Sequence, residues 1–330
     1  MKSSFASAIR CLDCRGELRL EVSEESPREV REGRLVCRSC AAVFPIVRGI
    51  PDFVDPDDRI LADEVAGWVR LAGPLGEHLD PVMAALPSYP GDPWPLVAPD
   101  FFQIFEDFDF AGKRVVDLGA GRTWSTRHLV ALGKPAEAVA VDIMTERYLG
   151  LETAELFFAG GIFFERLRAD GHRLPLVDAW ADVVFSCAAI HHSSDLDRLF
   201  AEVHRVLRPG GLLLFVSEPS KREAITWTKP QNEETAVGIN ENVYSLAEYR
   251  RALRRAGFSS RRLLPRSLAY RLRTIDPETG QDMPRFLVRW ARTERGRRFL
   301  LWALGTRTLG DWLYRWWSLP LSMAAVKNRS

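Results

Sequence analysis

The chain has 330 residues, of which 46% are hydrophobic and 27% are charged, and its formal net charge is +1. These values are ordinary for a soluble globular protein, and the length allows one large domain with smaller additions. A net charge so close to zero gives no general argument for nucleic-acid binding.

No apolar run approaches the ~18 residues that a membrane-spanning helix needs. The first ten residues contain too short an apolar stretch for a secretory signal. We therefore expect a cytoplasmic protein whose thiols are reduced and free to bind metal.

Four of the five cysteines form two pairs, Cys11 with Cys14 and Cys37 with Cys40, and two residues separate the members of each pair. Two such pairs place four thiolates around one tetrahedral site, and the residues between them alternate like β-strands. The spacing predicts a zinc ribbon over residues 1–54. Four thiolates leave no open position for water, so the zinc is expected to be structural. A ribbon that also holds a partner or nucleic acid stays an alternative.

Residues 55–110 are predicted to form a helical linker or lid. Asp58 ends a linker sequence and favours a helix start. Four phenylalanines recur at helical spacing between Phe101 and Phe108, after several proline breaks. This spacing favours a helix packed on a sheet, and a lid over a ligand would use the same apolar face.

Strand and helix patterns alternate over residues 111–267. The predicted strands are 115–118, 138–142, 163–169, 181–186 and 211–217. Their nearly continuous apolar character is typical of a parallel sheet that helices cover on both faces. Ligands of such sheets bind beyond the carboxyl ends of the strands, where the turns and acids of this sequence fall.

The first of these strands runs into a glycine turn, Val115-Val-Asp-Leu-Gly-Ala-Gly121. Glycines let the chain turn sharply and let a ligand approach the backbone. The second strand ends at Asp142, whose carboxylate could accept hydrogen bonds from both hydroxyls of a ribose. Together these features predict a nucleotide-like ligand at this edge of the sheet.

With Ala169-Asp170, residues 186–195 and Leu207-Arg-Pro-Gly-Gly211, these motifs resemble the class I S-adenosylmethionine-dependent methyltransferases over residues 111–258. The resemblance implies an α/β fold with a Rossmann-like seven-stranded sheet whose last strand is antiparallel. It also implies contacts with S-adenosylmethionine from Asp117, Gly119, Ala120, Gly121, Asp142, Ile143, Asp170, Gly171 and Ser186.

One position departs from the family pattern. Thr123, followed by Trp124, stands where the family often has a third glycine. A dinucleotide needs close backbone approach there for its pyrophosphate, which S-adenosylmethionine lacks. The departure therefore weakens an NAD-dependent oxidoreductase more than a methyltransferase.

The amino-terminal ribbon and the segment 44–53 that follows it resemble the Trm112-like zinc-ribbon segment that precedes many bacterial methyltransferases. A group of ribosomal-RNA guanine methyltransferases also begins with a zinc finger, although its cysteine spacing matches poorly. RNA therefore remains open as a substrate.

A hydroxyl that accepts a methyl group must lose its proton, so a general base is expected beside it. His191, His192 and Glu218 are the candidates, and a histidine pair that only shapes the pocket is the alternative. Residues 221–242 are predicted to form a loop over the site. Its candidate substrate contacts are Glu234, Asn240 and Glu241.

The last quarter is basic, with nineteen Lys and Arg against five acids from Arg250 to Ser330. Residues 258–264 and 319–326 are expected to be closing antiparallel strands, and 319–330 contain the final sheet strand. Between them, 268–318 are predicted to form a basic, aromatic helical insertion. Its residues 285–317 suit peripheral membrane contact, a lipid-linked substrate, nucleic acid, or a cap whose tryptophans pack on the domain.

The sequence thus predicts a cytoplasmic S-adenosylmethionine-dependent methyltransferase with a structural zinc ion, acting on an oxygen of a small-molecule, sugar or lipid-linked acceptor. No Asn-Pro-Pro-Tyr-type motif follows the fourth strand, which argues against methylation of base or amide nitrogen. The alternatives are an RNA methyltransferase that uses the ribbon and the basic region, and a non-catalytic scaffold of the same fold.

Overall fold

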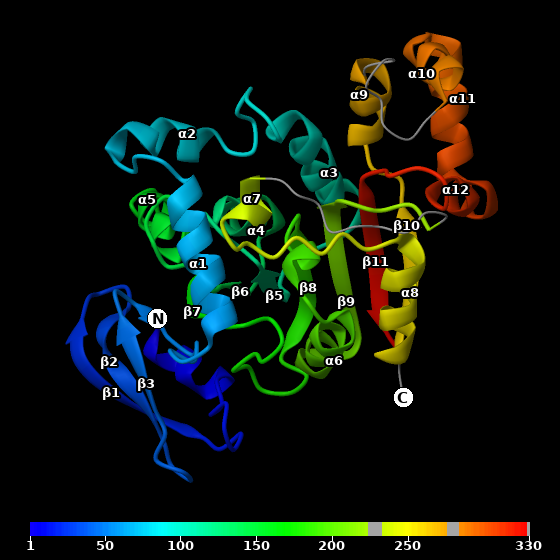
Figure 1. Cartoon of the computed structure of the whole chain (residues 1–330). Helices are drawn as coiled ribbons and strands as arrows, with labels where there is room; N and C mark the ends of the chain where they lie inside the picture. The colour runs from blue at the N-terminus through cyan, green and yellow to red at the C-terminus, as the bar shows by residue number, and fades with distance from the viewer. Residues whose placement is uncertain (224–232, 276–283, 329–330) are drawn as a thin grey trace.

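The computed structural model describes residues 1–223, 233–275 and 284–328, which form two β-sheets and the helices around them (Figure 1). The smaller sheet is antiparallel, with order β1-β2-β3-β4, and follows a short 3-10 helix, η1 (Ser3–Ala8). Its strands are β1 (Leu18–Glu25), β2 (Val30–Cys37), β3 (Val43–Val47) and β4 (Ile50–Pro51).

The larger sheet has seven strands in the order β10-β11-β9-β8-β5-β6-β7. They are β5 (Arg114–Leu118), β6 (Glu137–Asp142), β7 (Glu165–Arg168), β8 (Ala181–Cys187), β9 (Leu207–Glu218), β10 (Phe258–Leu263) and β11 (Leu321–Lys327). Strands β5 to β9 are parallel, and β11 pairs antiparallel with both β9 and β10. The predicted seven-stranded sheet with an antiparallel last strand is confirmed.

The expectation that both closing strands are antiparallel to the sheet is wrong for β10. Since β11 runs antiparallel to β9 and also to β10, β10 has the same direction as the parallel strands. The chain enters β10 from α8 (Leu246–Arg255), which begins with a capping box formed by Ser245 and Glu248. A helical crossover of this kind favours a parallel strand.

Both faces of the large sheet are covered, which explains the continuous apolar strands. In β8, Val184 packs in one core with helices α6 (Leu196–Val206) and α8. Its neighbours Val183 and Phe185 point to the other core, with α3 (Trp94–Asp107) and α4 (Trp124–Gly133). Because successive side chains of a strand alternate between faces, burial on both sides requires an apolar residue at each position.

The described helices that precede α8 include α1, ahead of the large sheet, and several short ones. Helix α1 (Arg59–Leu71) begins as predicted, because Asp58 accepts hydrogen bonds from the backbone of Ile60 and Leu61. The others are η2 (Glu77–Leu79), α2 (Asp80–Ala85), η3 (Leu151–Ala154), α5 (Glu155–Phe158), η4 (Ile190–His192) and α7 (Glu233–Ala236).

The small sheet joins the edge of the large one at β7. The backbone nitrogen of Phe53 donates to the carbonyl of Arg168 at 2.8 Å. Arg166, also on β7, is fully enclosed and lies 2.8 Å from Glu29 of the small sheet and 2.9 Å from Glu155. This buried cation of β7 thus links the two sheets, because one of its two carboxylate partners, Glu29, directly precedes β2.

In the described part of the chain, four helices lie between β10 and β11, at the end of the molecule away from the small sheet (Figure 1). They are α9 (Ser267–Thr274), α10 (Arg285–Arg292), α11 (Glu294–Gly305) and α12 (Arg307–Tyr314). Asp311 of α12 accepts hydrogen bonds from Arg250 and Arg262, which ties these helices to α8 and β10. Among the described residues, none of the helices has the length and apolar content of a membrane span.

Candidate active site

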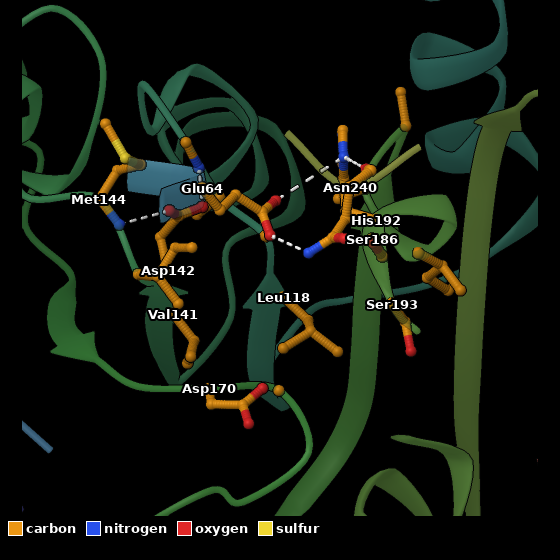
Figure 2. Close-up of a pocket in the computed structure, with 18 of the residues that line it drawn as sticks. Glu64, Leu118, Val141, Asp142, Met144, Asp170, Ser186, His192, Ser193 and Asn240 are labelled. Carbon is orange, nitrogen blue, oxygen red and sulfur yellow. Dashed lines mark hydrogen bonds and ion pairs between the residues drawn. The ribbon is translucent and has the colours of Figure 1, made fainter. Parts of the chain in front are cut away.

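A cavity of about 620 Å³ opens where the parallel strands end, and Figure 2 shows part of its lining. Its size is that of a typical cofactor or small-ligand site. Eight of the nine residues predicted to contact S-adenosylmethionine line it: Gly119, Ala120, Gly121, Asp142, Ile143, Asp170, Gly171 and Ser186. Their convergence follows from the topology, since each ends or follows a parallel strand.

The turn after β5 is built around Gly119, whose φ of +72° lies in the left-handed region. A Cβ at this position would lie 2.4 Å from the Cβ of Ala189, so the turn packs directly against the loop that follows β8. A side chain there would force the two walls of the cavity apart.

Asp117, also predicted to contact the cofactor, does not line the cavity. Its carboxylate is buried behind the turn and accepts hydrogen bonds of 2.6 Å from the hydroxyls of Ser125 and Thr126. Burial raises the pKa of this carboxyl to about 6. The structure corrects the sequence expectation: Asp117 anchors the first turn of α4.

The missing third glycine is accommodated locally. Thr123 adopts the left-handed conformation itself, with φ +57°. Trp124 turns inward, where its ring lies 4.7 Å from that of Phe101 and 5.5 Å from that of Trp94. The bulky residue therefore supports the wall of the cavity.

Asp142 ends β6 at the cavity. Its two carboxylate oxygens accept hydrogen bonds from the backbone nitrogens of Gly121, at 2.7 Å, and Met144, at 2.8 Å. These bonds fix the carboxylate, and each oxygen retains a lone pair for a ligand hydroxyl. Burial raises the pKa of the Asp142 carboxyl above its usual value.

Further along the same edge, Asp170 accepts a 2.7 Å hydrogen bond from Nδ1 of His172, whose Nε2 lies 2.8 Å from the Ser193 hydroxyl. Burial alone would raise the pKa of Asp170, but the contacts with His172 lower it overall. The hydroxyl of Ser186 lines the cavity and has no hydrogen-bond partner. A buried hydroxyl without a partner is the environment expected where a ligand supplies one.

Glu218 does not line the cavity. It is fully buried and accepts hydrogen bonds from three consecutive backbone nitrogens, those of Ala189, Ile190 and His191. Burial alone would raise its pKa, but the contact with His191 lowers it overall. The structure therefore gives Glu218 the role of holding the loop after β8, in place of the predicted base.

His191 lies between two carboxylates, those of Glu218 and Glu241. Burial would lower the pKa of its imidazole, but these carboxylates raise it to about 10. An imidazole that is already protonated at neutral pH cannot accept a proton, and His191 does not line the cavity. This placement corrects its predicted role as a base.

His192 lines the cavity, as does Asn240. Nδ1 of His192 lies 2.5 Å from the Asn240 carbonyl, which requires the proton to be on Nδ1 and leaves Nε2 unprotonated. Burial, reinforced by the charge of His191, lowers the pKa of His192 to about 4. Two adjacent histidines therefore differ in charge at neutral pH.

Glu64 is a cavity residue that the sequence analysis missed. It comes from α1 and accepts a 3.0 Å hydrogen bond from the Asn240 amide (Figure 2). Its other carboxylate oxygen lies 3.8 Å from Nδ1 of His192. Burial raises the pKa of Glu64 to about 7. The sequence offered one signal for this residue: Glu64 lies on the same face of the predicted helix as the apolar residues Leu61 and Trp68.

Of the three loop residues predicted to contact the substrate, two line the cavity and one does not. Glu234 and Asn240 line the cavity, whereas Glu241 faces His191, with its carboxylate 3.5 Å from the imidazole Nε2. The part of the loop at 224–232 lies outside the described residues.

The four paired cysteines converge at the end of the small sheet. The Sγ atoms of Cys14 and Cys37 are 3.4 Å apart, those of Cys14 and Cys40 are 3.5 Å apart, and those of Cys11 and Cys40 are 3.6 Å apart. Tetrahedral zinc with Zn–S bonds of about 2.3 Å needs sulfurs about 3.8 Å apart. The cluster is therefore compatible with structural zinc.

Two parts of the sequence match known protein families. Residues 116–215 match the methyltransferase domain family, and residues 4–49 match the Trm112p-like family. The chain carries a methyltransferase domain behind a Trm112-like domain. S-adenosylmethionine is the cofactor that this domain indicates. The cavity lies beyond the carboxyl ends of the parallel strands, which is where sheets of this kind bind their ligands.

Three curated relatives resemble parts of the chain. Phthiotriol/phenolphthiotriol dimycocerosates methyltransferase 1 of Mycobacterium ulcerans is 28% identical over 54% of this chain and 64% of its own length. A malonyl-[acyl-carrier protein] O-methyltransferase of Methylovorus is 30% identical over 46% and 51%. The 27-O-demethylrifamycin SV methyltransferase of Amycolatopsis mediterranei is 29% identical over 57% and 63%. The chain thus spans between half and two thirds of these relatives.

Among solved structures, geranyl diphosphate C-methyltransferase from Streptomyces coelicolor superimposes with a TM-score of 0.55 and 14% identity. The match covers 84% of this chain and 100% of that one. At this identity the likeness concerns the fold.

Proposed function

We propose that this chain is an S-adenosylmethionine-dependent methyltransferase that acts on an oxygen of a small or lipid-linked molecule. The observation that supports this most is the cavity at the strand ends, where the glycine turn, Asp142, Asp170 and Ser186 converge. When bound, S-adenosylmethionine supplies an electrophilic methyl group on a sulfonium ion.

Each wall of the cavity suits one part of that cofactor. The fixed carboxylate of Asp142 would accept the two ribose hydroxyls, because its orientation is set by backbone hydrogen bonds. Asp170, held by His172, would meet the adenine edge. The glycine turn would receive the methionine part, since no side chain lies in the way.

Two neighbouring cavity residues, Glu64 and His192, are the candidates for the acceptor proton, because both contact Asn240. An effective general base has a pKa near the working pH. Burial raises the pKa of Glu64 to about 7, whereas that of His192 is lowered to about 4. Glu64 is therefore the proton acceptor in this proposal, and Asn240 orients both side chains. Glu64 would accept the proton that an acceptor hydroxyl must lose when its oxygen receives the methyl group.

An oxygen acceptor agrees with what the relatives are named for. The malonyl-[acyl-carrier protein] enzyme is named an O-methyltransferase, and the rifamycin enzyme is named for a 27-O-demethyl acceptor. A proton-accepting carboxylate in the cavity supports the same chemistry, because a hydroxyl acceptor must lose its proton.

The cofactor part of the proposal is tested by calorimetric titration with S-adenosylhomocysteine. Asp142→Ala should weaken binding about a hundredfold, since a charge-assisted bidentate contact contributes about 3 kcal/mol. Glu137→Ala, at the exposed opposite end of β6, is the matched control and should bind like the wild type. Equal affinities for Asp142→Ala and the wild type would remove the basis of the proposal.

The reaction is tested with methyl-labelled S-adenosylmethionine and an extract of small molecules and lipids. We expect label in products whose new methyl group is bonded to oxygen. Transfer to nitrogen or carbon alone would contradict the proposed acceptor class, and binding without any transfer would favour a scaffold role.

A further inference from the structure

The helices α10–α12 expose an unusual number of aromatic side chains. Among the described residues, every tryptophan and phenylalanine that is exposed lies here, with exposed fractions between 38% and 68%. They are Phe286, Trp290, Phe299, Trp302, Trp312 and Trp316. The sequence left open a cap whose tryptophans pack on the domain, and Trp317 does so, but these six do not.

Four of these rings belong to one patch on α10 and α11. The ring of Phe299 lies 5.4 Å from that of Trp290 and 5.6 Å from that of Trp302. Phe286 precedes Trp290 by four residues and so lies on the same face of α10. We call these four residues the aromatic patch. Exposed apolar surface that is contiguous in this way marks an interaction site.

The same helices are strongly basic. Residues 285–317 contain eight arginines, no lysine and two acids. One of these acids, Asp311, is held by Arg250 and Arg262, which leaves Glu294 as the exposed acid of the segment. The exposed arginines are Arg285, Arg289, Arg292, Arg295, Arg298, Arg307 and Arg315.

We propose that α10–α12 bind the surface of an anionic lipid bilayer, with the aromatic patch at the level of the headgroups. Tryptophan prefers this depth because its ring is apolar and its N–H is polar. Arginine pairs with lipid phosphates through two parallel hydrogen bonds. Arginines interleaved with Trp, Phe and Leu on short helices are typical of interfacial binding, and no helix here spans the bilayer.

The charge of the segment complements an anionic surface, and each arginine close to it contributes about 1 kcal/mol. Single-stranded RNA also combines with arginine and aromatic residues, but it stacks its bases on separate rings. In the aromatic patch the rings pack against one another instead. This arrangement favours the bilayer. The surface lies outside the cavity, so the inference stands independently of the methyl acceptor.

The test is co-sedimentation of the full chain with vesicles of phosphatidylcholine, with and without about one third phosphatidylglycerol. The wild type should bind the anionic vesicles, and binding should weaken as salt is raised. The double variants Trp290→Ser/Trp302→Ser and Arg295→Glu/Arg298→Glu should each weaken binding about tenfold or more, because each removes one of the two contributions.

Two control variants carry the same chemical changes elsewhere. Leu132→Ser replaces an exposed apolar residue on α4, and Arg251→Glu/Arg254→Glu reverses two exposed arginines of α8. Both should bind vesicles like the wild type. The proposal is overturned if the wild type ignores anionic vesicles, or if the patch variants bind as well as it does. It is also overturned if the variants change only RNA binding or self-association.

Discussion

Nδ1 of His191 lies 2.8 Å from a carboxylate oxygen of Glu218, and both side chains are closed off from solvent. Glu218 also receives the backbone nitrogens of the loop after β8, so the pair fixes this loop to the end of β9. His191 therefore acts as a charged residue that stabilises the loop beside the cavity.

This pair predicts a pH-dependent stability. The pKa of His191 is raised from 6.5 to about 10 in the folded protein. Its contribution to stability is therefore fully present below pH 6.5 and is lost as the pH rises towards 10. Across that window the free energy of unfolding should fall by up to about 1.4 kcal/mol per pH unit more in the wild type than in His191→Gln. Denaturant titrations at several pH values measure it, and parallel curves for the two proteins would contradict the assignment.

Glu64 predicts the pH dependence of the proposed reaction. Because the deprotonated carboxylate accepts the proton and its pKa is about 7, kcat/KM should rise with pH to a plateau with a midpoint near 7. Glu64→Gln should lower kcat by about 10²–10⁴ and abolish this step. The neighbouring exposed residue provides the control, since Asp63→Asn should keep the wild-type profile. An unchanged pH profile in Glu64→Gln would assign the proton to another group.

The cysteine cluster predicts a metal requirement for the small sheet. Cys40→Ser should reduce the zinc content and destabilise residues 1–54, because structural zinc supplies folding free energy to a segment with a small core. Zinc analysis and thermal unfolding measure the two effects. Cys187→Ser, outside the cluster, should retain the full zinc content. If the purified wild-type protein contains no zinc, or if a chelator does not lower its thermal stability, a structural zinc ion is ruled out.

Arg166 predicts that the two sheets depend on each other. Arg166→Met removes the buried cation between Glu29 and Glu155, although Glu29 keeps the amino group of Met1 at 3.1 Å and Arg31 at 3.0 Å. The loss of hydrogen bonds between charged groups should cost about 1.5–3 kcal/mol of unfolding free energy. For comparison, Arg208→Met breaks the half-exposed pair with Asp182 and should cost only about 0–1 kcal/mol. Similar losses for both single variants in denaturant titrations would mean that the link between the sheets contributes little.

The features that sequence predicted well are local. The nearly continuous apolar runs predicted the strands of the large sheet, and the spacing of the cysteines predicted their cluster. The glycine turn before Trp124 and the helix cap at Asp58 are set by backbone conformation within a few residues. Such signals survive without tertiary information, because the interactions that cause them connect near neighbours.

The tertiary structure decided which polar groups face the cavity. His191 and His192 are adjacent in sequence, yet one is enclosed between carboxylates and the other lines the cavity. Glu64 reaches the site only because α1 packs beside Asn240, which lies 176 residues further along the chain. Charge and proton affinity depend on burial and on neighbours brought together by folding, so no local pattern could assign these roles.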